Sequence, residues 1–90
     1  MTKKLQTNKD TEDFTNPLYT FDLGVAASLV TAGFEVVILD KVNPRKVQFV
    51  FRRATGIEKV MDDYWTDKLK VKARSFFDNI KMLKNRIYSE

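Results

Sequence analysis

The sequence has no cysteine and no histidine among its 90 residues. Without cysteine the chain cannot form a disulfide, a thiolate nucleophile or a cysteine-based zinc site. Without histidine it lacks the usual general base near neutral pH, and a Ser-His-Asp triad is excluded. A hydrolase would have to rely on lysine or carboxylate chemistry alone. We therefore expect a protein that is not an enzyme and that uses no cofactor.

Long apolar runs are also missing. None approaches the roughly 18 residues that a membrane-spanning helix needs, and the polar segment 1–16 shows no signal-peptide pattern. The chain still has seven Phe, three Tyr and one Trp to bury, which argues against global disorder. We expect a cytoplasmic protein without membrane contact. Its residues 1–17 are predicted to form a mobile polar tail, and residues 18–90 a single small domain.

Charge is distributed unevenly along the chain. The 16 Lys and Arg residues exceed the 12 Asp and Glu residues by four, and the isoelectric point is near 9.4. From Lys68 to Arg86, seven basic residues stand against one acid, Asp78. From Glu58 to Asp67, four acids stand against one lysine. A basic segment beside an acidic one indicates an anionic partner without identifying it.

A helix and then two strands are predicted in the first half of the domain. Apolar residues dominate Asp22–Ala32, where Asp22 is suited to cap a helix and Gly33 to close one. Because this helix is apolar nearly all round, we expect it to be covered on more than one side. The β-branched segment Phe34–Asp40 and the alternating segment Lys46–Arg52 predict an antiparallel hairpin.

Two amphipathic helices are predicted in the second half. The run Thr55-Gly56-Ile57-Glu58 matches a capping box, and an apolar stripe follows it at helical spacing through Tyr64 and Trp65. A last helix is predicted from about Ala73 to Tyr88. Its apolar face is expected to consist of five residues: Phe76, Phe77, Ile80, Leu83 and Ile87.

The predicted fold class is therefore α+β, in the order helix, antiparallel β-hairpin, two helices. A two-stranded hairpin alone is marginally stable in water. We expect a third strand from Tyr19–Phe21 or from Leu69–Val71, or edge pairing with a second copy of the chain in a homodimer.

The basic residues are the main candidates for a binding site. Lys and Arg side chains neutralise phosphates and release counterions, which gives affinity without sequence reading. Tyr64, Trp65 and Tyr88 would add base stacking where they reach the surface. The alternative is that these charges only solvate the outer faces of helices. The candidate nucleic-acid-binding residues are Arg45, Lys46, Arg52, Arg53, Lys68, Lys70, Lys72, Arg74, Lys81 and Lys84.

The Tyr64-Trp65 pair has two interpretations. Its place in an apolar stripe favours a core position, particularly for Trp65, whereas a sole tryptophan is also a typical anchor of a protein interface. We keep both residues as candidate interface residues.

The carboxylates give a weaker signal. Asp62 and Asp63 are neighbours on a helix and point about 100° apart, which does not build a metal site. Asp40 with Lys46 and Gln48 resembles part of a metal-dependent nuclease pattern, but the second acid is missing. Asp40 is more simply a turn former, and we predict no metal site.

Several runs of residues together resemble a small family described only as a domain of unknown function. They are Tyr19-Thr20-Phe21-Asp22-Leu23, Ala26-Ala27-Ser28-Leu29, Gly33-Phe34-Glu35, Asn43-Pro44-Arg45-Lys46-Val47-Gln48-Phe49-Val50-Phe51, Tyr64-Trp65, Leu69-Lys70-Val71 and Leu83-Lys84-Asn85-Arg86-Ile87-Tyr88. The resemblance covers residues 18–89 and brings no catalytic residue. It implies an intracellular accessory protein of a phage or mobile element.

Two functions of different classes remain open at this point. The first is a nucleic-acid-binding accessory protein that acts through its basic surface on DNA or RNA. The second is a protein-interaction module, either a homodimer or a protein that docks on a host or element-encoded partner. The first has named residues behind it and is the preferred hypothesis.

Overall fold

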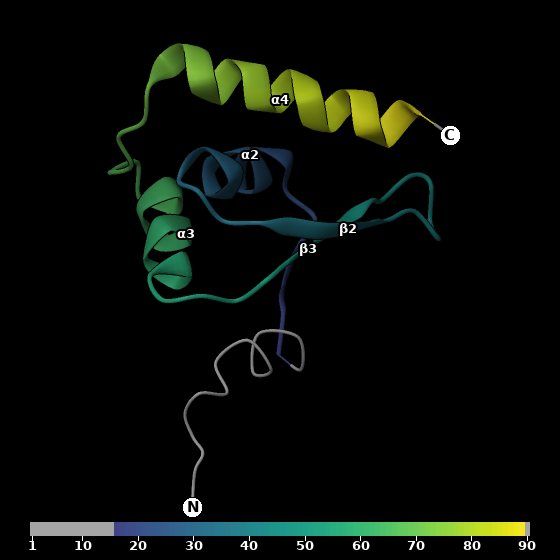
Figure 1. The fold of residues 1–90 in the computed structure, drawn as a ribbon, viewed down its shortest axis with the longest axis horizontal. Coiled ribbons are helices and arrows are strands. Elements are labelled where there is room, and N and C mark those ends of the chain that lie inside the picture. Colours follow the sequence, from purple (N-terminus) through teal and green to yellow (C-terminus); the bar gives the residue numbers. More distant parts are fainter. Residues whose placement is uncertain (1–15, 90) are drawn as a thin grey trace, which may run out of the picture.

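The computed structural model describes residues 16–89. Figure 1 shows its elements, which are β1 (Leu18–Thr20), α2 (Leu23–Thr31), β2 (Val36–Asp40), β3 (Gln48–Phe51), α3 (Ile57–Trp65) and α4 (Ala73–Tyr88). The chain has the predicted α+β fold, with a helix, a hairpin and two helices in the predicted order. Apart from Asn16 and Pro17, the predicted tail lies outside the described residues.

The three strands form one antiparallel sheet in the order β1-β3-β2. Of the two local candidates for the third strand, the segment around Tyr19 pairs with β3, with Tyr19 opposite Val50. Leu69–Val71 has no regular structure. The hairpin therefore gains its third strand from within the chain, and the fold does not need a second copy for this purpose.

A β-bulge interrupts the pairing of β2 with β3. Val36 lies opposite Phe51 and Ile38 lies opposite Val50, so Val37 is the additional residue. Because side chains alternate between the two faces of a sheet, the bulge changes which residues of β2 face the helices. Leu39 packs with the core, whereas Ile38 is 54% exposed on the opposite face.

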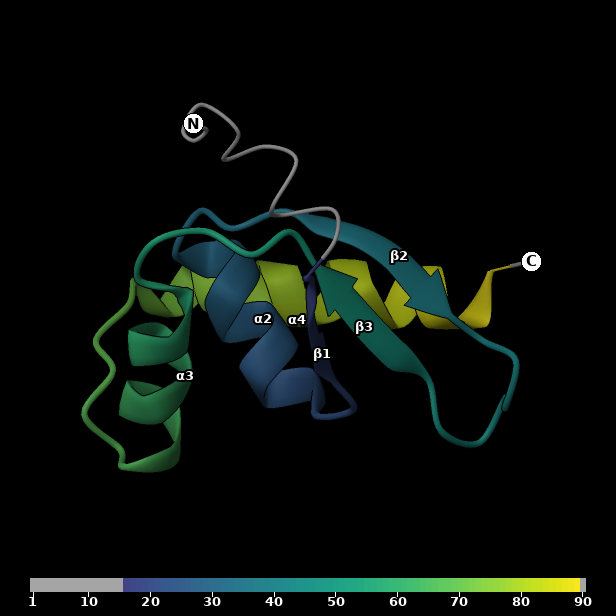
Figure 2. The ribbon, with the colours of Figure 1, turned by 90° about the horizontal axis from the view of Figure 1, so that it is seen from below.

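α2 and α4 lie on one side of the sheet, and α3 lies beside the sheet at one end of the molecule (Figures 1 and 2). α2 packs directly against the sheet, α4 crosses over α2, and α3 lies at one end of α2. Figure 2 shows the other face of the sheet turned away from these helices. The expectation that α2 is covered on more than one side is confirmed, because Val25, Ala26, Ala27 and Leu29 are completely buried.

The core lies between the sheet and the helices. Its largest buried side chains come from β3, α2, α3 and α4, and are Phe49, Phe51, Leu29, Ile57 and Leu83. A polar contact fixes α4 on α2 beside this core: Asn79 Nδ2 donates to Thr31 Oγ1 at 2.9 Å. At the far end of α4, Lys41 Nζ donates to the carbonyl oxygen of Ser89 at 2.8 Å.

The ends of α2 follow the predicted chemistry. Asp22 is the N-cap, and its Oδ1 accepts from the backbone N–H of Val25 at 2.9 Å. Thr20 Oγ1 accepts from the backbone N–H of Asp22 at 3.1 Å. Gly33 follows the helix at a φ of 103°, the left-handed conformation that glycine adopts without steric cost.

The capping box predicted for α3 is wrong. The N-cap is Gly56, at a φ of 91°, and it makes no side-chain capping bond. The backbone N–H of Ile57 instead donates to the carbonyl of Ala54, and the carboxylate of Glu58 pairs with Arg53. A turn with a left-handed glycine replaces the Thr-Glu exchange, because Glu58 has a guanidinium within reach.

The bounds of α4 agree with the prediction, but one member of its expected buried face does not. Phe77 is 58% exposed, whereas Phe76, Ile80 and Ile87 pack against the core around the fully buried Leu83. Adjacent helical residues point about 100° apart, so Phe76 and Phe77 cannot both face the narrow surface that α2 offers.

Candidate nucleic-acid interface

The basic segment begins where α3 ends. The backbone N–H of Asp67 donates to the carbonyl of Tyr64, and that of Lys68 donates to the carbonyl of Asp63. This is a Schellman ending, with Asp67 in the left-handed conformation at a φ of 61°. It turns the chain out of α3 into an irregular connection that carries the exposed side chains of Lys68, Lys70 and Lys72.

α4 continues this basic segment with a row of exposed residues. At 100° per residue, five exposed side chains fall within about 80° of the helix circumference. We call them the α4 stripe: Arg74, Phe77, Lys81, Lys84 and Tyr88. Phe77 is 58% exposed and Tyr88 is 80% exposed, so two aromatic rings lie among the cations along the helix. Arg86 lies on the other flank of α4, near Leu39 and Lys41.

The contacts within the α4 stripe are weak and leave its charges accessible. Lys81 Nζ lies 5.1 Å from the centroid of the Phe77 ring. Arg74 Nε lies 3.8 Å from Asp78 Oδ2, with 92% of its side chain exposed. A pair of this kind contributes little in water, so Asp78 offsets little of the positive charge.

The beginning of α4 adds to this positive field. No side chain caps the first turn, and the first turn contains no acidic residue. The first backbone N–H groups of the helix and its macrodipole therefore act together with Lys70, Lys72 and Arg74. Six cations form what we call the basic surface: Lys68, Lys70, Lys72, Arg74, Lys81 and Lys84.

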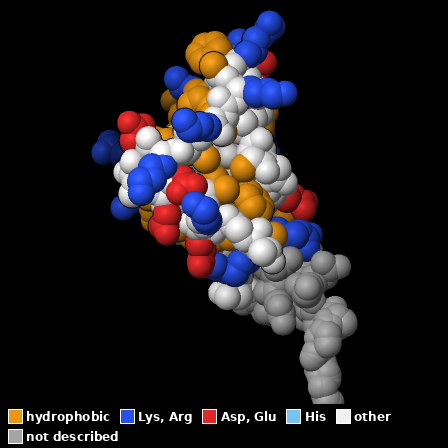
Figure 3. Space-filling model, turned by 90° about the vertical axis from the view of Figure 1, so that its left-hand side faces the viewer, with side chains coloured by type: hydrophobic (Ala, Val, Ile, Leu, Met, Phe, Trp, Pro, Cys, Tyr) orange, Lys and Arg blue, Asp and Glu red, His pale blue; other side chains and the backbone are white. Residues whose placement is uncertain are grey.

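Figure 3 shows the end of the molecule where α3 lies. Lys and Arg side chains dominate the upper part of this face, on the side of α4, and exposed hydrophobic side chains lie among them. Most of the acidic side chains lie lower and are mixed with basic ones. The acidic segment predicted from the sequence is thus the exposed side of α3, where Glu58 and Asp62 are exposed.

The candidate residues of the hairpin lie apart from the basic surface. Figure 1 shows the β2–β3 loop and the α3–α4 connection at opposite ends of the molecule. Arg45 and Lys46 are in that loop, and Lys46 Nζ lies 4.7 Å from the centroid of the Phe21 ring. The fold therefore separates Arg45 and Lys46 from the lysines of the α3–α4 connection.

The two arginines after β3 have carboxylate partners. Arg52 Nε lies 3.0 Å from Glu35 Oε1, and Arg53 forms an ion pair with Glu58. Arg53 Nε also donates to the carbonyl of Asn16 at 2.9 Å. These contacts join β3 to its neighbouring segments, so both arginines offer a phosphate less net charge than the lysines of the basic surface.

The side chains of Tyr64 and Trp65 differ in their exposure to solvent. Tyr64 packs against the core and against Gly24 of α2, whereas Trp65 is 60% exposed. The two rings meet edge to face, with centroids 5.2 Å apart. The core position favoured for Trp65 is wrong, because α2 is too narrow a partner to cover both rings. Their role as interface residues stays a prediction.

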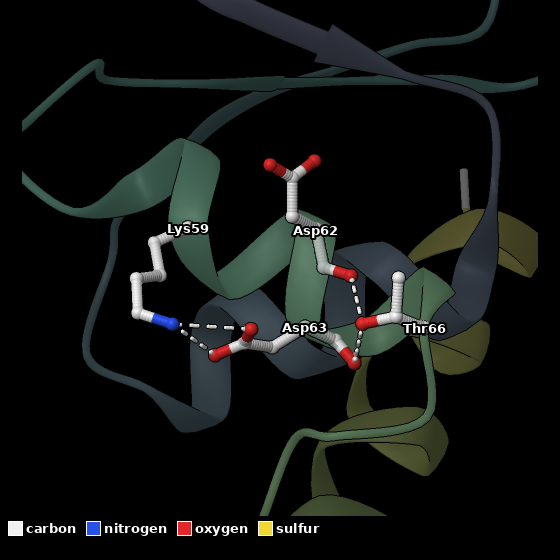
Figure 4. Close-up of polar contacts among 4 residues, drawn as sticks. All are labelled: Lys59, Asp62, Asp63 and Thr66. Atoms are coloured by element: carbon white, nitrogen blue, oxygen red, sulfur yellow. Dashed lines mark hydrogen bonds and ion pairs between the residues drawn. The ribbon is translucent and has the colours of Figure 1, made fainter.

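The carboxylates of α3 diverge, as the sequence predicts. Figure 4 shows Asp63 turned to Lys59, whose Nζ lies 3.0 Å from Asp63 Oδ2, and Asp62 pointing elsewhere. Thr66 Oγ1 donates to the backbone carbonyl of Asp62. Within residues 16–89, no three Asp or Glu side chains are grouped so that they could hold a metal ion. Asp40 accepts from the backbone N–H of Val42, as a turn former does.

The face of the sheet away from the helices is a second exposed surface. Tyr19, Val50 and Ile38 lie opposite one another across the three strands, and Tyr19 and Ile38 are 55% and 54% exposed. They line a shallow hollow of about 380 Å³ together with Pro17, Val37, Asp40 and Arg52. We call this surface the open sheet face. It is apolar in the middle and charged at both ends.

Sequence reasoning missed Phe77 as a surface residue. The signal was present, because Arg74, Phe77, Lys81, Lys84 and Tyr88 recur at spacings of three and four. This is a second helical stripe beside the buried one, and the apolar character of Phe77 caused it to be counted with the core.

Comparison with known proteins matches this chain to one protein family. The family described as "Domain of unknown function (DUF5659)" matches residues 15–89. No curated protein and no solved structure matches the chain. In the described part of the chain, no helix is long and apolar enough to cross a membrane.

Proposed function

Since the chain belongs to the family of domains of unknown function DUF5659, whose description names no activity, we propose a function from the residues themselves. The protein is a non-enzymatic accessory protein that binds nucleic acid electrostatically through the basic surface. The observation that carries this proposal is the row of six exposed cations along the α3–α4 connection and α4, against which stand two acids, Asp67 and Asp78.

The physical argument rests on charge density and accessibility. α4 spans 16 residues, which is about 24 Å, and a row of cations of that length meets several phosphates of a strand. Each neutralised phosphate releases counterions, so binding is favourable at low salt without any base contact. Arg52 and Arg53 are not part of the proposed site, because they already form ion pairs with Glu35 and Glu58.

The biological setting belongs to the same proposal. The resemblance seen in the sequence implies a phage or mobile-element protein that works in the cytoplasm. An accessory protein of this kind that holds DNA or RNA through its charge needs no catalytic side chain, which agrees with a sequence free of cysteine and histidine.

The test is a binding titration with a mixed oligonucleotide at low and physiological salt. A variant with Lys70→Gln, Lys72→Gln and Lys84→Gln is expected to bind at least tenfold more weakly at low salt, because three phosphate contacts are lost. A matched control with Arg45→Gln, Lys46→Gln and Lys59→Gln changes the net charge equally, outside the basic surface, and is expected to bind like the parent protein.

Two results would count against the proposal. If neither single-stranded nor duplex oligonucleotides bind at low salt, the basic surface is a solvated helix face. If the two triple variants lose affinity equally, binding depends on net charge and not on this surface.

A second candidate function is favoured by one observation, the open sheet face. Tyr19 and Ile38 are exposed on either side of the buried Val50, and neighbouring exposed apolar side chains are typical of an interaction site. This face supports the alternative of a protein-interaction module, with self-association as the simplest form.

Light scattering coupled to size exclusion tests this alternative. A dimer that Ile38→Lys converts to a monomer would support it, provided that Val42→Lys leaves the dimer intact. Val42 is 91% exposed in the same hairpin, so this control makes a similar change outside the open sheet face. A monomer at all concentrations would exclude self-association.

A further inference from the structure

The α4 stripe contains two exposed aromatic residues, which electrostatic binding does not explain. Electrostatic binding needs only the lysines and the arginine, yet Phe77 and Tyr88 project from the same side of α4. An exposed phenylalanine on a charged helix face loses favourable burial, and its 58% exposure is not relieved by the neighbouring elements.

The spacing of the two rings fits a strand with accessible bases. They are eleven residues apart, which is about 16 Å along a helix axis, and Lys81 and Lys84 lie between them. Lys81 Nζ is 5.1 Å from the Phe77 centroid, so a base resting on that ring has a cation beside it for its phosphate. Aromatic rings interleaved with cations are the arrangement on which unpaired bases stack.

A duplex cannot use these rings in the same way. Its bases are stacked on one another and offer only their edges in the grooves, so it gains from the cations alone. Single strands expose the flat faces of their bases, and each base stacked on an aromatic ring contributes a large part of the affinity.

We infer that the α4 stripe is a site for single-stranded nucleic acid, with Phe77 and Tyr88 as base-stacking residues and the cations between them as phosphate ligands. This inference rests on the proposed function and narrows it to unpaired strands. The two rings are equivalent for DNA and RNA, because every base has a face that can stack.

The experiment compares three probes of about 20 units, which is longer than the α4 stripe: oligothymidylate, oligouridylate and a mixed-sequence DNA duplex. The full chain is expected to bind at least one single strand about tenfold or more tightly than the duplex at the same salt. The tighter of the two single strands identifies DNA or RNA as the source.

The decisive variant is Phe77→Leu with Tyr88→Leu, which keeps apolar side chains and removes the stacking rings. It is expected to bind the preferred single strand about tenfold or more weakly, while its duplex affinity stays unchanged. A matched control replaces two exposed aromatics elsewhere, Tyr19→Leu with Phe21→Leu, and is expected to bind like the parent. Thermal unfolding of each variant verifies that it is folded.

The outcomes separate the inference from the proposed function. Equal affinity for single strand and duplex, with no effect of the Phe77 and Tyr88 changes, would overturn the inference and leave electrostatic binding intact. Absence of salt-sensitive binding to all three probes would overturn both.

Discussion

At the scale of single residues, the contact with Tyr64 requires glycine at position 24. A Cβ at Gly24 would clash with the Tyr64 hydroxyl and would lie 2.7 Å from its Cζ. Tyr64 belongs to the partly buried layer around the core, so its ring cannot move away freely. The absence of a side chain at Gly24 is what lets α3 approach α2.

Gly24→Ala is therefore expected to destabilise the domain by about 1–3 kcal/mol, as overpacking does. The free energy of unfolding in urea, followed by circular dichroism, measures this loss. In a Tyr64→Ala background the same change should cost much less, because alanine is then only a better helix former than glycine. An equal loss in both backgrounds would contradict the contact.

Ser28 is a buried polar residue without compensation. It is fully buried in α2, and its Oγ has no hydrogen-bond partner among the described residues. Burial of this hydroxyl costs desolvation free energy, and no hydrogen bond within the protein compensates for that cost.

We expect Ser28→Ala to stabilise the domain by about 1 kcal/mol, because the unpaired hydroxyl is removed and alanine favours the helix. Urea unfolding gives the difference, and Ser75→Ala, an exposed position of α4, serves as a control that should change little. A loss of stability in Ser28→Ala would mean that the hydroxyl is paired in solution.

At the scale of elements, two helices end in the same way with different residues. Gly33 lies two residues after the end of α2 and Asp67 lies two residues after the end of α3. Both residues have a positive φ, and both helix ends make the Schellman pair of hydrogen bonds. Glycine accepts this conformation freely, whereas an L-residue with a Cβ is strained in it. The carboxylate of Asp67 also lies at the negative end of the helix dipole.

Asp67→Gly is expected to stabilise the domain by about 0.5–1 kcal/mol, and Gly33→Ala to destabilise it by about 1 kcal/mol. Midpoints of urea unfolding compare the two variants with the parent protein. The opposite signs make the comparison specific, since a general effect of glycine on the unfolded chain would not depend on φ. Destabilisation by Asp67→Gly would show that the Asp67 side chain contributes to the turn.

At the scale of the whole molecule, the number of exposed cations in the basic surface sets the response of nucleic-acid binding to salt. The basic surface contains six, and the affinity for a single strand falls with salt at a logarithmic slope of about 0.7 per neutralised phosphate. If all six engage, the slope is about −4. The variant with Lys70→Gln, Lys72→Gln and Lys84→Gln should have a slope of about −2.

A titration of affinity against salt concentration measures both slopes. The control with Arg45→Gln, Lys46→Gln and Lys59→Gln should keep the slope of the parent protein. A slope near −4 in the Lys70, Lys72 and Lys84 variant would mean that the phosphates are held elsewhere.

Much of the fold follows from local patterns. Asp22 and Gly33 delimit α2 because capping and left-handed turns depend on chemistry within a few residues. Alternation in Lys46–Arg52 predicts β3 because the buried Phe49 and Phe51 need a common face. The α3 cap was mispredicted at Thr55 and Glu58, since Arg53 competes for Glu58 through a contact that the local motif does not contain.

The sequence by itself determined the absence of cysteine and histidine chemistry, the order of the elements, and the cations before and along α4, since composition and helical spacing are properties of the chain. Only the tertiary structure decided which of these groups are accessible. Burial depends on neighbours that are distant in sequence: α2 is too narrow to cover Phe77 and Trp65, and Glu35 and Glu58 neutralise Arg52 and Arg53. The same packing leaves one face of the sheet open, where the bulge at Val37 places Ile38 outside the core.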